Sequence, residues 1–309
     1  METFIQQIIN GLVLGSIYSL VALGYTMVYG ILNLINFAHG DVLMIGAMTA
    51  LSTILIVQAA FPDAPSWVLL LAGMGAAIPT CVITSLIIER VAYRPLRNAP
   101  RLAPLITAIG VSIVLQTLAM LIWGRNFRTV PQLLPTEPID FFGATLTVNK
   151  IVVILLSAAI MIGLMLLVNR TRLGRGMRAT AENPRIAGLM GVNPNYVIAV
   201  TFAIGATLAA VAGVMFAATY TVVHFYMGFL PGLKAFTAAV LGGIGNIPGA
   251  MVGGLLLGIV EALGAGYIGD LTNGVLGSHY QDVFAFIVLC TVLILRPSGL
   301  LGERVAERA

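Results

Sequence analysis

The sequence opens with a run, from Thr3 to Gly40, that contains no Asp, Glu, Lys or Arg. At about 1.5 Å per residue, one straight helix of that length would far exceed a hydrocarbon core roughly 30 Å thick. The run therefore predicts a membrane span plus a second element. Only 9% of the 309 residues are charged and 59% are hydrophobic, against about 25% charged in soluble domains. This composition excludes a soluble enzyme, a disordered chain and a nucleic-acid-binding protein, and it predicts a polytopic membrane protein.

The apolar runs predict an all-α fold. We expect one transmembrane domain over residues 1–309, a polytopic membrane helical bundle of eight or nine spans with broken or re-entrant elements. The expected long spans are Phe4–Tyr29, Val42–Ala60, Trp67–Ile88, Ala103–Trp123, Ile151–Val168, Tyr196–Ala217, Ala250–Leu263 and Val283–Leu295. A short segment, Gly232–Leu241, carries Lys234 and makes the ninth span if it crosses or forms a broken helix.

Arginines gather in alternate loops, which the positive-inside rule assigns to the cytoplasm. The three groups are Arg90, Arg94, Arg97 and Arg101; Arg170, Arg172, Arg175, Arg178 and Arg185; and Arg296, Arg304 and Arg308. Acidic residues mark the other loops, which we expect outside: Asp63, Glu137, Asp140 and Asp270. The N-terminus has no Lys or Arg before its first span and is expected outside, with the C-terminus cytoplasmic. Opposite sides require an odd number of crossings, which favours nine.

Small residues four positions apart recur inside the expected spans, as at Gly11 and Gly15 and at Gly254 and Gly258. In lipid this spacing lets helices approach closely. Packing within the chain is the favoured interpretation, and a seam with a second subunit is the alternative. The outer loop, residues 124–149, is expected to contain a small hairpin about Gly143 and to form either a cap or a docking surface.

Catalytic and nucleotide-binding signatures are absent from the sequence. It contains no GxxxxGK[ST], GxSxG or HExxH pattern, and His39, His224 and His279 have no metal-ligand spacing. The sequence therefore predicts no catalysis, no metal site and no cofactor on this chain.

Polar residues crowd the junction of the first two apolar runs, where Asn33, Asn36, His39 and Asp41 follow one another closely. Irregular backbone at membrane depth is tolerated only where protein or a water-filled cavity satisfies it. Two interpretations stay open. One is an ordinary cytoplasmic turn with Asp41 capping the next helix, and the other is a re-entrant element near a transport path.

A glycine-rich turn, Gly242–Gly249, resembles that first junction in its spacing and includes Gly243, Gly245 and Asn246. Transporters often contain repeats with discontinuous helices at the site. Glu261 is the one acidic residue deep in an expected span, so it should face the bundle interior. A structural hydrogen bond and a pathway role are equally open for it.

The cytoplasmic loop, residues 169–195, combines apolar and charged residues in a pattern that a short helix would present on one surface. It suits docking into a partner groove, and a solvated loop is the alternative. The candidate contact residues are Arg178, Glu182, Asn183, Arg185, Ala187, Gly188 and Gly191.

Four segments together resemble the branched-chain amino acid ABC transporter permeases of the LivH type. The resemblance lies in Gly24–Ile31 with Ile35–Asp41, in Arg178–Asn183 with Ala187–Asn193, in Lys234–Asn246 with Pro248–Ala250, and in Arg296–Leu300 with Gly302. The segments keep the family order and span nearly the whole chain.

The resemblance implies a permease subunit of an importer in the bacterial inner membrane. Such a subunit pairs with a second, LivM-type permease, while two cytoplasmic ATPase subunits bind ATP and Mg and a periplasmic amino-acid-binding protein docks outside. The segment Arg178–Asn193 is similar to the element that couples to an ATPase, although it departs from the EAA motif of other importers. The expected mechanism is alternating access for branched-chain or related small amino acids.

Two competing classes follow from the residues. An autonomous ion-coupled secondary transporter or channel would use Asp41 and Glu261 as coupling sites. An integral membrane enzyme ranks last, because the chain has no nucleophile–base or metal set.

Overall fold

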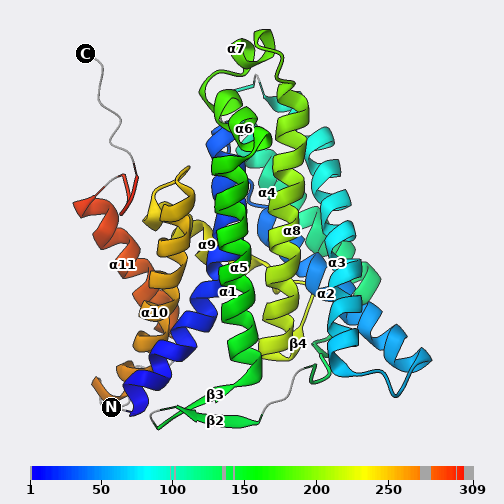
Figure 1. Cartoon of the computed structure of the whole chain (residues 1–309), viewed down its shortest axis with the longest axis vertical. Coiled ribbons are helices and arrows are strands. Elements are labelled where there is room, and N and C mark those ends of the chain that lie inside the picture. Colours follow the sequence, from blue (N-terminus) through cyan, green and yellow to red (C-terminus); the bar gives the residue numbers. More distant parts are fainter. Residues whose placement is uncertain are drawn as a thin grey trace.

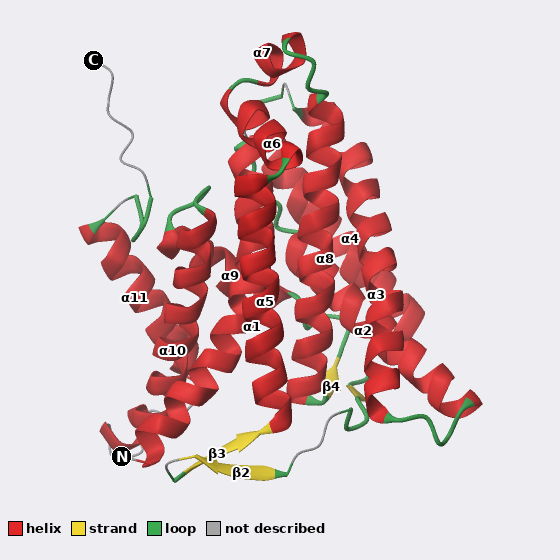
Figure 2. Cartoon of the chain, in the orientation of Figure 1, coloured by secondary structure: helices red, strands yellow, loops and turns green. Residues whose placement is uncertain are grey.

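The computed structural model describes residues 2–97, 99–100, 102–133, 137–141, 143–271, 280–296 and 298–302. Within these ranges the fold is an all-helical bundle with two small strand pairs (Figures 1 and 2). Arg101, His279, Arg304 and Arg308, which were considered above, lie outside the described residues.

Seven helices in the described residues are long and apolar enough to cross a membrane, and two shorter apolar helices accompany them. The long helices are α1 (Glu2–Leu32), α2 (His39–Ala60), α3 (Ser66–Ile88), α4 (Leu102–Trp123), α5 (Val148–Arg170), α8 (Pro194–Tyr220) and α10 (Ile247–Leu271). The shorter ones are α9 (Phe229–Gly242) and α11 (Gln281–Leu295). The expected all-α polytopic bundle is confirmed, and the seven long helices with the two shorter ones roughly match the expected eight or nine spans.

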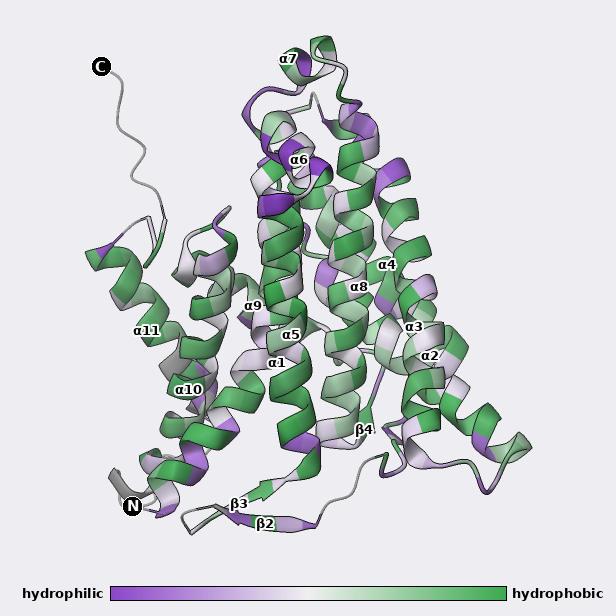
Figure 3. Ribbon diagram, viewed as in Figure 1, coloured by the Kyte–Doolittle hydropathy of each residue, from purple (hydrophilic) through white to green (hydrophobic). Residues whose placement is uncertain are grey.

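Two ends of the bundle differ in what they carry (Figure 1). One end, called here the α7 end, holds the short helices α6 (Arg172–Glu182) and α7 (Pro184–Leu189). The opposite, hairpin end holds β2 (Pro138–Phe141), β3 (Ala144–Thr147) and the start of α1. Hydrophilic residues concentrate around α6 and α7, whereas the long helices between the two ends are mainly hydrophobic (Figure 3). The bundle therefore has an apolar belt with a polar tip.

The hairpin about Gly143 is confirmed, because β2 and β3 pair antiparallel with Phe141 opposite Ala144. Gly143 has φ 80°, a left-handed conformation that glycine adopts without cost. The side chain of Gln6 accepts a hydrogen bond from the backbone N–H of Thr145 at 2.8 Å, which ties the hairpin to α1. A second pair joins β1 (Arg128–Thr129) to β4 (Val222–Val223).

The glycine repeats pack within the chain, as favoured by the sequence. A Cβ placed on Gly11 would stand 2.6 Å from the Cα of Ile259, and one on Gly15 would stand 2.8 Å from the Cα of Leu255. Gly254 and Gly258 lie on the facing side of α10, against Ser19 and Gly15. Backbones this close leave no room for side chains, so these glycines determine how near α10 lies to α1.

Two boundaries differ from the expected ones. The connection between the first two spans, which were expected to end at Tyr29 and to begin at Val42, is only residues 33–38, because α1 continues to Leu32 and α2 begins at His39. The span expected to end at Leu263 runs to Leu271, since glycines are tolerated inside membrane helices.

The α1–α10 contact predicts a sharp difference between two glycine substitutions. Gly258→Leu forces side-chain atoms into the backbone of α1 at Gly15 and should destabilise the protein by about 3 kcal/mol. The check is the midpoint of thermal unfolding of the detergent-solubilised protein, which we expect to fall.

Gly163→Leu is the matched control, because among the described residues nothing lies within 4 Å of a Cβ at Gly163. We expect its unfolding midpoint to stay near that of the unaltered protein. Equal midpoints for the two variants would contradict the role assigned to the α1–α10 contact.

Candidate functional site

The connection between α1 and α2 folds back into the bundle. A Cβ on Gly24 would meet the His39 imidazole, 2.6 Å from Cε1, so the start of α2 lies beside Gly24. Gly24 is eight residues before the end of α1 at Leu32, which is about 12 Å along an α-helix. Asn33 permits the reversal, since it takes a left-handed φ of 52° and donates its N–H to the Tyr29 carbonyl at 2.7 Å. The geometry is that of a re-entrant break.

Asn36, His39 and Asp41 of this break are buried, whereas Asn33 is exposed. Asn36 and Asp41 find hydrogen-bond partners on other elements. Asn36 is 2% exposed and accepts a hydrogen bond from the Tyr93 hydroxyl at 3.1 Å. Asp41 accepts one from the Gln116 side chain of α4 at 2.9 Å. The alternative in which Asp41 caps the helix is wrong: Ala38 is the N-cap residue, and no side chain caps α2.

The start of α9 meets the start of α2. A Cβ on Gly40 would stand 2.8 Å from the Cα of Gly232, so the two backbones touch. Aromatic rings surround the contact: Tyr25 lies 4.9 Å from His39 and 6.0 Å from Phe236, centroid to centroid. Two discontinuous helices thus begin at one place inside the bundle, with α1 alongside.

A buried ion-pair cluster joins α9 to α10 and α11. The Lys234 ammonium lies 2.6 Å from a carboxylate oxygen of Glu261 and 2.6 Å from one of Asp282. Lys234 is 7% exposed and Glu261 2%, and the Tyr18 hydroxyl donates to Glu261 at 3.3 Å. In an apolar medium, such charges are retained only when they are paired. Glu261 therefore has a structural role, because it links α10 to α1 through Tyr18 and to α9 through Lys234.

The glycine-rich turn lies at the α7 end of α9 and is held by the residues that follow α11. Gly243 and Gly245 have φ of 108° and 91°, conformations that favour glycine. Leu300 and Leu301 donate backbone hydrogen bonds to Leu241 and Gly242 at 2.9 and 3.0 Å. Asn246 donates its side-chain N–H to the Leu301 carbonyl at 2.6 Å. The turn also approaches α1, since a Cβ on Gly30 would stand 3.6 Å from the Cα of Gly245.

The predicted coupling segment is a helical pair. Asn183 ends α6 and begins α7, and its side chain accepts the backbone N–H groups of Arg185 and Ile186 at 3.0 and 3.1 Å. Gly191, with φ 83°, follows α7, and Ala187 is buried. Nothing among the described residues lies within 4 Å of a Cβ at Gly188. The charged side chains of Glu182 and Arg185 are both exposed.

Large apolar side chains of α7 point away from the rest of the chain. Leu189 is 82% exposed, Met190 79% and Ile186 56%. Exposed apolar side chains of this kind are typical of interaction sites.

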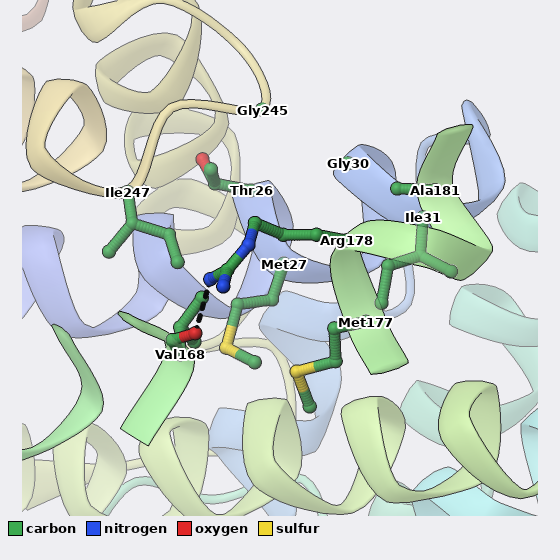
Figure 4. A pocket seen from close by; sticks show the side chains of 10 residues that line it. All are labelled: Thr26, Met27, Gly30, Ile31, Val168, Met177, Arg178, Ala181, Gly245 and Ile247. Atoms are coloured by element: carbon green, nitrogen blue, oxygen red, sulfur yellow. Dashed lines mark hydrogen bonds between the residues drawn. The ribbon is translucent and has the colours of Figure 1, made fainter. Parts of the chain in front are cut away.

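A pocket lies just beneath this pair, between α1, α5, α6 and the glycine-rich turn (Figure 4). Its volume is about 90 Å³. Arg178 crosses it and donates a hydrogen bond to the Val168 carbonyl (Figure 4). The pocket brings Arg178 of the predicted coupling segment together with Gly245 of the glycine-rich turn.

His224 lies in the connection between β4 and α9. Its Nδ1 accepts the backbone N–H of Tyr226 at 3.2 Å, and its ring lies 4.8 Å from that of Phe127, centroid to centroid. Partial burial lowers the pKa of His224 below its usual value, which favours the neutral imidazole.

Several residues of these clusters escaped the sequence analysis: Tyr18, Tyr93, Gln116 and Asp282. A lysine inside an apolar segment was a usable signal, because Lys234 needs a carboxylate nearby. Tyr93 and Gln116 gave no such signal, since their roles come from contacts between distant segments.

Comparison with known proteins assigns the chain to a family. Residues 7–293 match the sequence model of the family described as branched-chain amino acid transport system / permease component. The high-affinity branched-chain amino acid transport system permease protein BraD of Pseudomonas aeruginosa is 47% identical over 99% of this chain and 98% of its own length. LivH of Escherichia coli K12 is 45% identical over 99% and 97%. A probable LivH of Methanocaldococcus jannaschii is 30% identical over 95% and 91%.

The fold and these matches define a polytopic membrane permease. The chain belongs to the family of permease components of branched-chain amino acid transport systems. It is therefore a transport subunit and not an enzyme, and the resemblance found in the sequence is confirmed.

The Lys234–Glu261 pair predicts non-additive effects of substitution. Lys234→Met leaves the buried Glu261 carboxylate and the partly exposed Asp282 carboxylate without their cation and should destabilise the protein by about 3 kcal/mol. Glu261→Gln removes one of those charges. The double variant should therefore be more stable than Lys234→Met alone, as measured by thermal unfolding in detergent. Additive losses would show that the two side chains do not interact.

Proposed function

We propose that this chain is the permease subunit of an ATP-driven importer that moves branched-chain or related small amino acids across the bacterial inner membrane by alternating access. Near-complete coverage of BraD and LivH, at 47% and 45% identity, supports the substrate class. In this proposal the binding of ATP and Mg belongs to separate subunits.

The observation that carries the proposal is the exposed apolar tip of α7, formed by Ile186, Leu189 and Met190. The sequence contains no phosphate-binding loop, so the chain needs another protein to use ATP. A short helix with protruding apolar side chains suits insertion into a groove of that protein. We assign this groove to the ATPase subunits and the contacts to Arg178, Glu182, Asn183, Arg185, Ala187, Gly188 and Gly191 with the tip.

The α7 end is the cytoplasmic side in this proposal, because it carries the arginines of the loops after α3 and α5. The hairpin end then faces the periplasm, with the N-terminus outside. The β2–β3 hairpin offers a rigid docking surface to a periplasmic amino-acid-binding protein, since Gln6 ties it to α1.

The moving parts in this proposal are the discontinuous helices. We place the gate at the re-entrant break, with Asn33, Asn36, His39 and Asp41, and its hinge at Gly243, Gly245 and Asn246. Closure of the ATPases would push α7 and α6, which touch α1 and the glycine-rich turn through Arg178 and the pocket. A second, LivM-type permease subunit would complete the path, and the weakly buried helices α3, α4 and α5 offer apolar surface to it and to lipid.

The ion-coupled alternative finds less support in the residues that would carry it. Glu261 is held by Lys234 and Tyr18, and Asp41 by Gln116. A coupling carboxylate has to exchange its ion during each cycle, which these contacts oppose. Among the described residues, no group of three His, Cys, Asp or Glu side chains is arranged to hold a metal ion.

The docking role of α7 predicts uncoupling without unfolding. Leu189→Asp places a charge in the proposed apolar contact and should lower ATP-driven uptake by about tenfold or more. The basal ATPase rate of the assembled complex should persist, since the nucleotide site lies on another subunit. Uptake and ATP hydrolysis are measured together in proteoliposomes.

Gly188→Trp adds a bulky side chain at the same tip and should also lower ATP-driven uptake. Leu189→Met keeps a large apolar side chain at the tip and serves as the conservative control. Uptake unchanged in Leu189→Asp would count against the docking role.

The proposed orientation predicts which sites react from each side of the membrane. In a variant with Cys81 and Cys290 replaced by serine, a cysteine at Asp63 should react with a membrane-impermeant thiol reagent in intact spheroplasts. A cysteine at Leu189 should react only after the membrane is opened. The reverse pattern would overturn the orientation.

A further inference from the structure

The pocket beneath α6 has walls of two chemical kinds (Figure 4). Its apolar lining includes Met27, Ile31, Met177 and Ile247, and its polar lining is Thr26 and Arg178. A volume of about 90 Å³ is ample for several waters or for a short branched aliphatic chain. The two polar side chains determine which ligand fits.

Arg178 presents an unpaired cation to this space. Its guanidinium donates to the Val168 carbonyl and, within the described part of the chain, forms no ion pair with a carboxylate. A guanidinium has five N–H donors in a planar fork that matches a carboxylate. The remaining donors of Arg178 are therefore suited to a carboxylate ligand.

Thr26 supplies a second, independent polar group. It is 1% exposed, and its hydroxyl has no hydrogen-bond partner among the described residues. A buried hydroxyl without a partner costs about 1–3 kcal/mol. The pocket that Thr26 lines is the place where a ligand oxygen could relieve that cost (Figure 4).

We propose that this pocket binds an aliphatic α-amino acid of the transported class, with its carboxylate on Arg178 and Thr26 and its branched side chain against Met27, Ile31 and Met177. The inference rests on the proposed function and orientation, because the occupant is the amino acid already released on the α7 side. A bound molecule bridges α6 to α1 and to the glycine-rich turn. It therefore holds α6 and α7 in place and slows further import when the internal amino acid is abundant.

The binding experiment uses the complete permease–ATPase complex in nanodiscs, without nucleotide or binding protein, and tritiated L-leucine as the probe. Unlabelled 4-methylpentanoate keeps the carboxylate and the aliphatic chain but lacks the ammonium group, and it should compete. 3-Methylbutylamine keeps the chain and the ammonium but lacks the carboxylate, and it should not compete. Competition by the amine alone would overturn the proposal.

Two variants locate the binding. Thr26→Val should weaken leucine binding about fivefold and Arg178→Gln about tenfold or more, as expected for a neutral and a charge-assisted hydrogen bond. Thr49→Val is the matched control, since Thr49 also has a buried hydroxyl without a partner in the described residues but lies on α2, outside the pocket. Equal affinity in all three variants would place the leucine elsewhere and refute the site.

The regulatory consequence is measured in proteoliposomes loaded with ATP, with binding protein outside. Leucine preloaded inside should slow the initial uptake by the unaltered complex and should slow Thr26→Val much less. If preloaded leucine inhibits uptake equally in the unaltered complex and in Thr26→Val, the pocket is not the site that causes the inhibition. If the unaltered complex takes up no leucine at all, the proposed function fails; if it takes up leucine but leucine binding does not depend on Thr26 and Arg178, only this inference fails.

Discussion

The close approach of α1 to its neighbours supports the rest of the structure. Glycines on α1 and α10 bring their backbones together at Gly15 and Gly258, and Gly24 leaves space for the start of α2 beside it. Lipid provides no hydrophobic force between helices, so packing at this distance has to supply the attraction. Because α1 lies against α2, α8, α9 and α10, its position determines where both discontinuous helices begin.

The second constraint is that polar groups inside the membrane need partners. Lys234 binds Glu261 and Asp282, Asp41 binds Gln116, and Asn36 binds Tyr93. Each of these contacts joins a discontinuous helix or its break to a continuous one. The polar residues thereby fix the positions of α2 and α9 in the bundle.

Much of the fold follows from the sequence, because apolar length and arginine distribution are local signals. The long helices, the hairpin about Gly143 and the helical character of the loop over residues 169–195 were all predicted. The depth of the re-entrant break was not, since it depends on His39 meeting Gly24 across the bundle. The pocket was missed for a similar reason: Thr26 and Arg178 lie far apart in the chain, and neither is unusual in its own segment.

The central claim is that α7 transmits ATP-driven motion from another subunit to this bundle. Its most direct test is a photoreactive amino acid at Leu189 in the complex within native membranes, compared with the same group at Leu121, an exposed residue of the long helix α4. The account predicts a covalent product with the ATPase subunit from position 189 and none from position 121. Active uptake with no ATPase product from position 189 would contradict it.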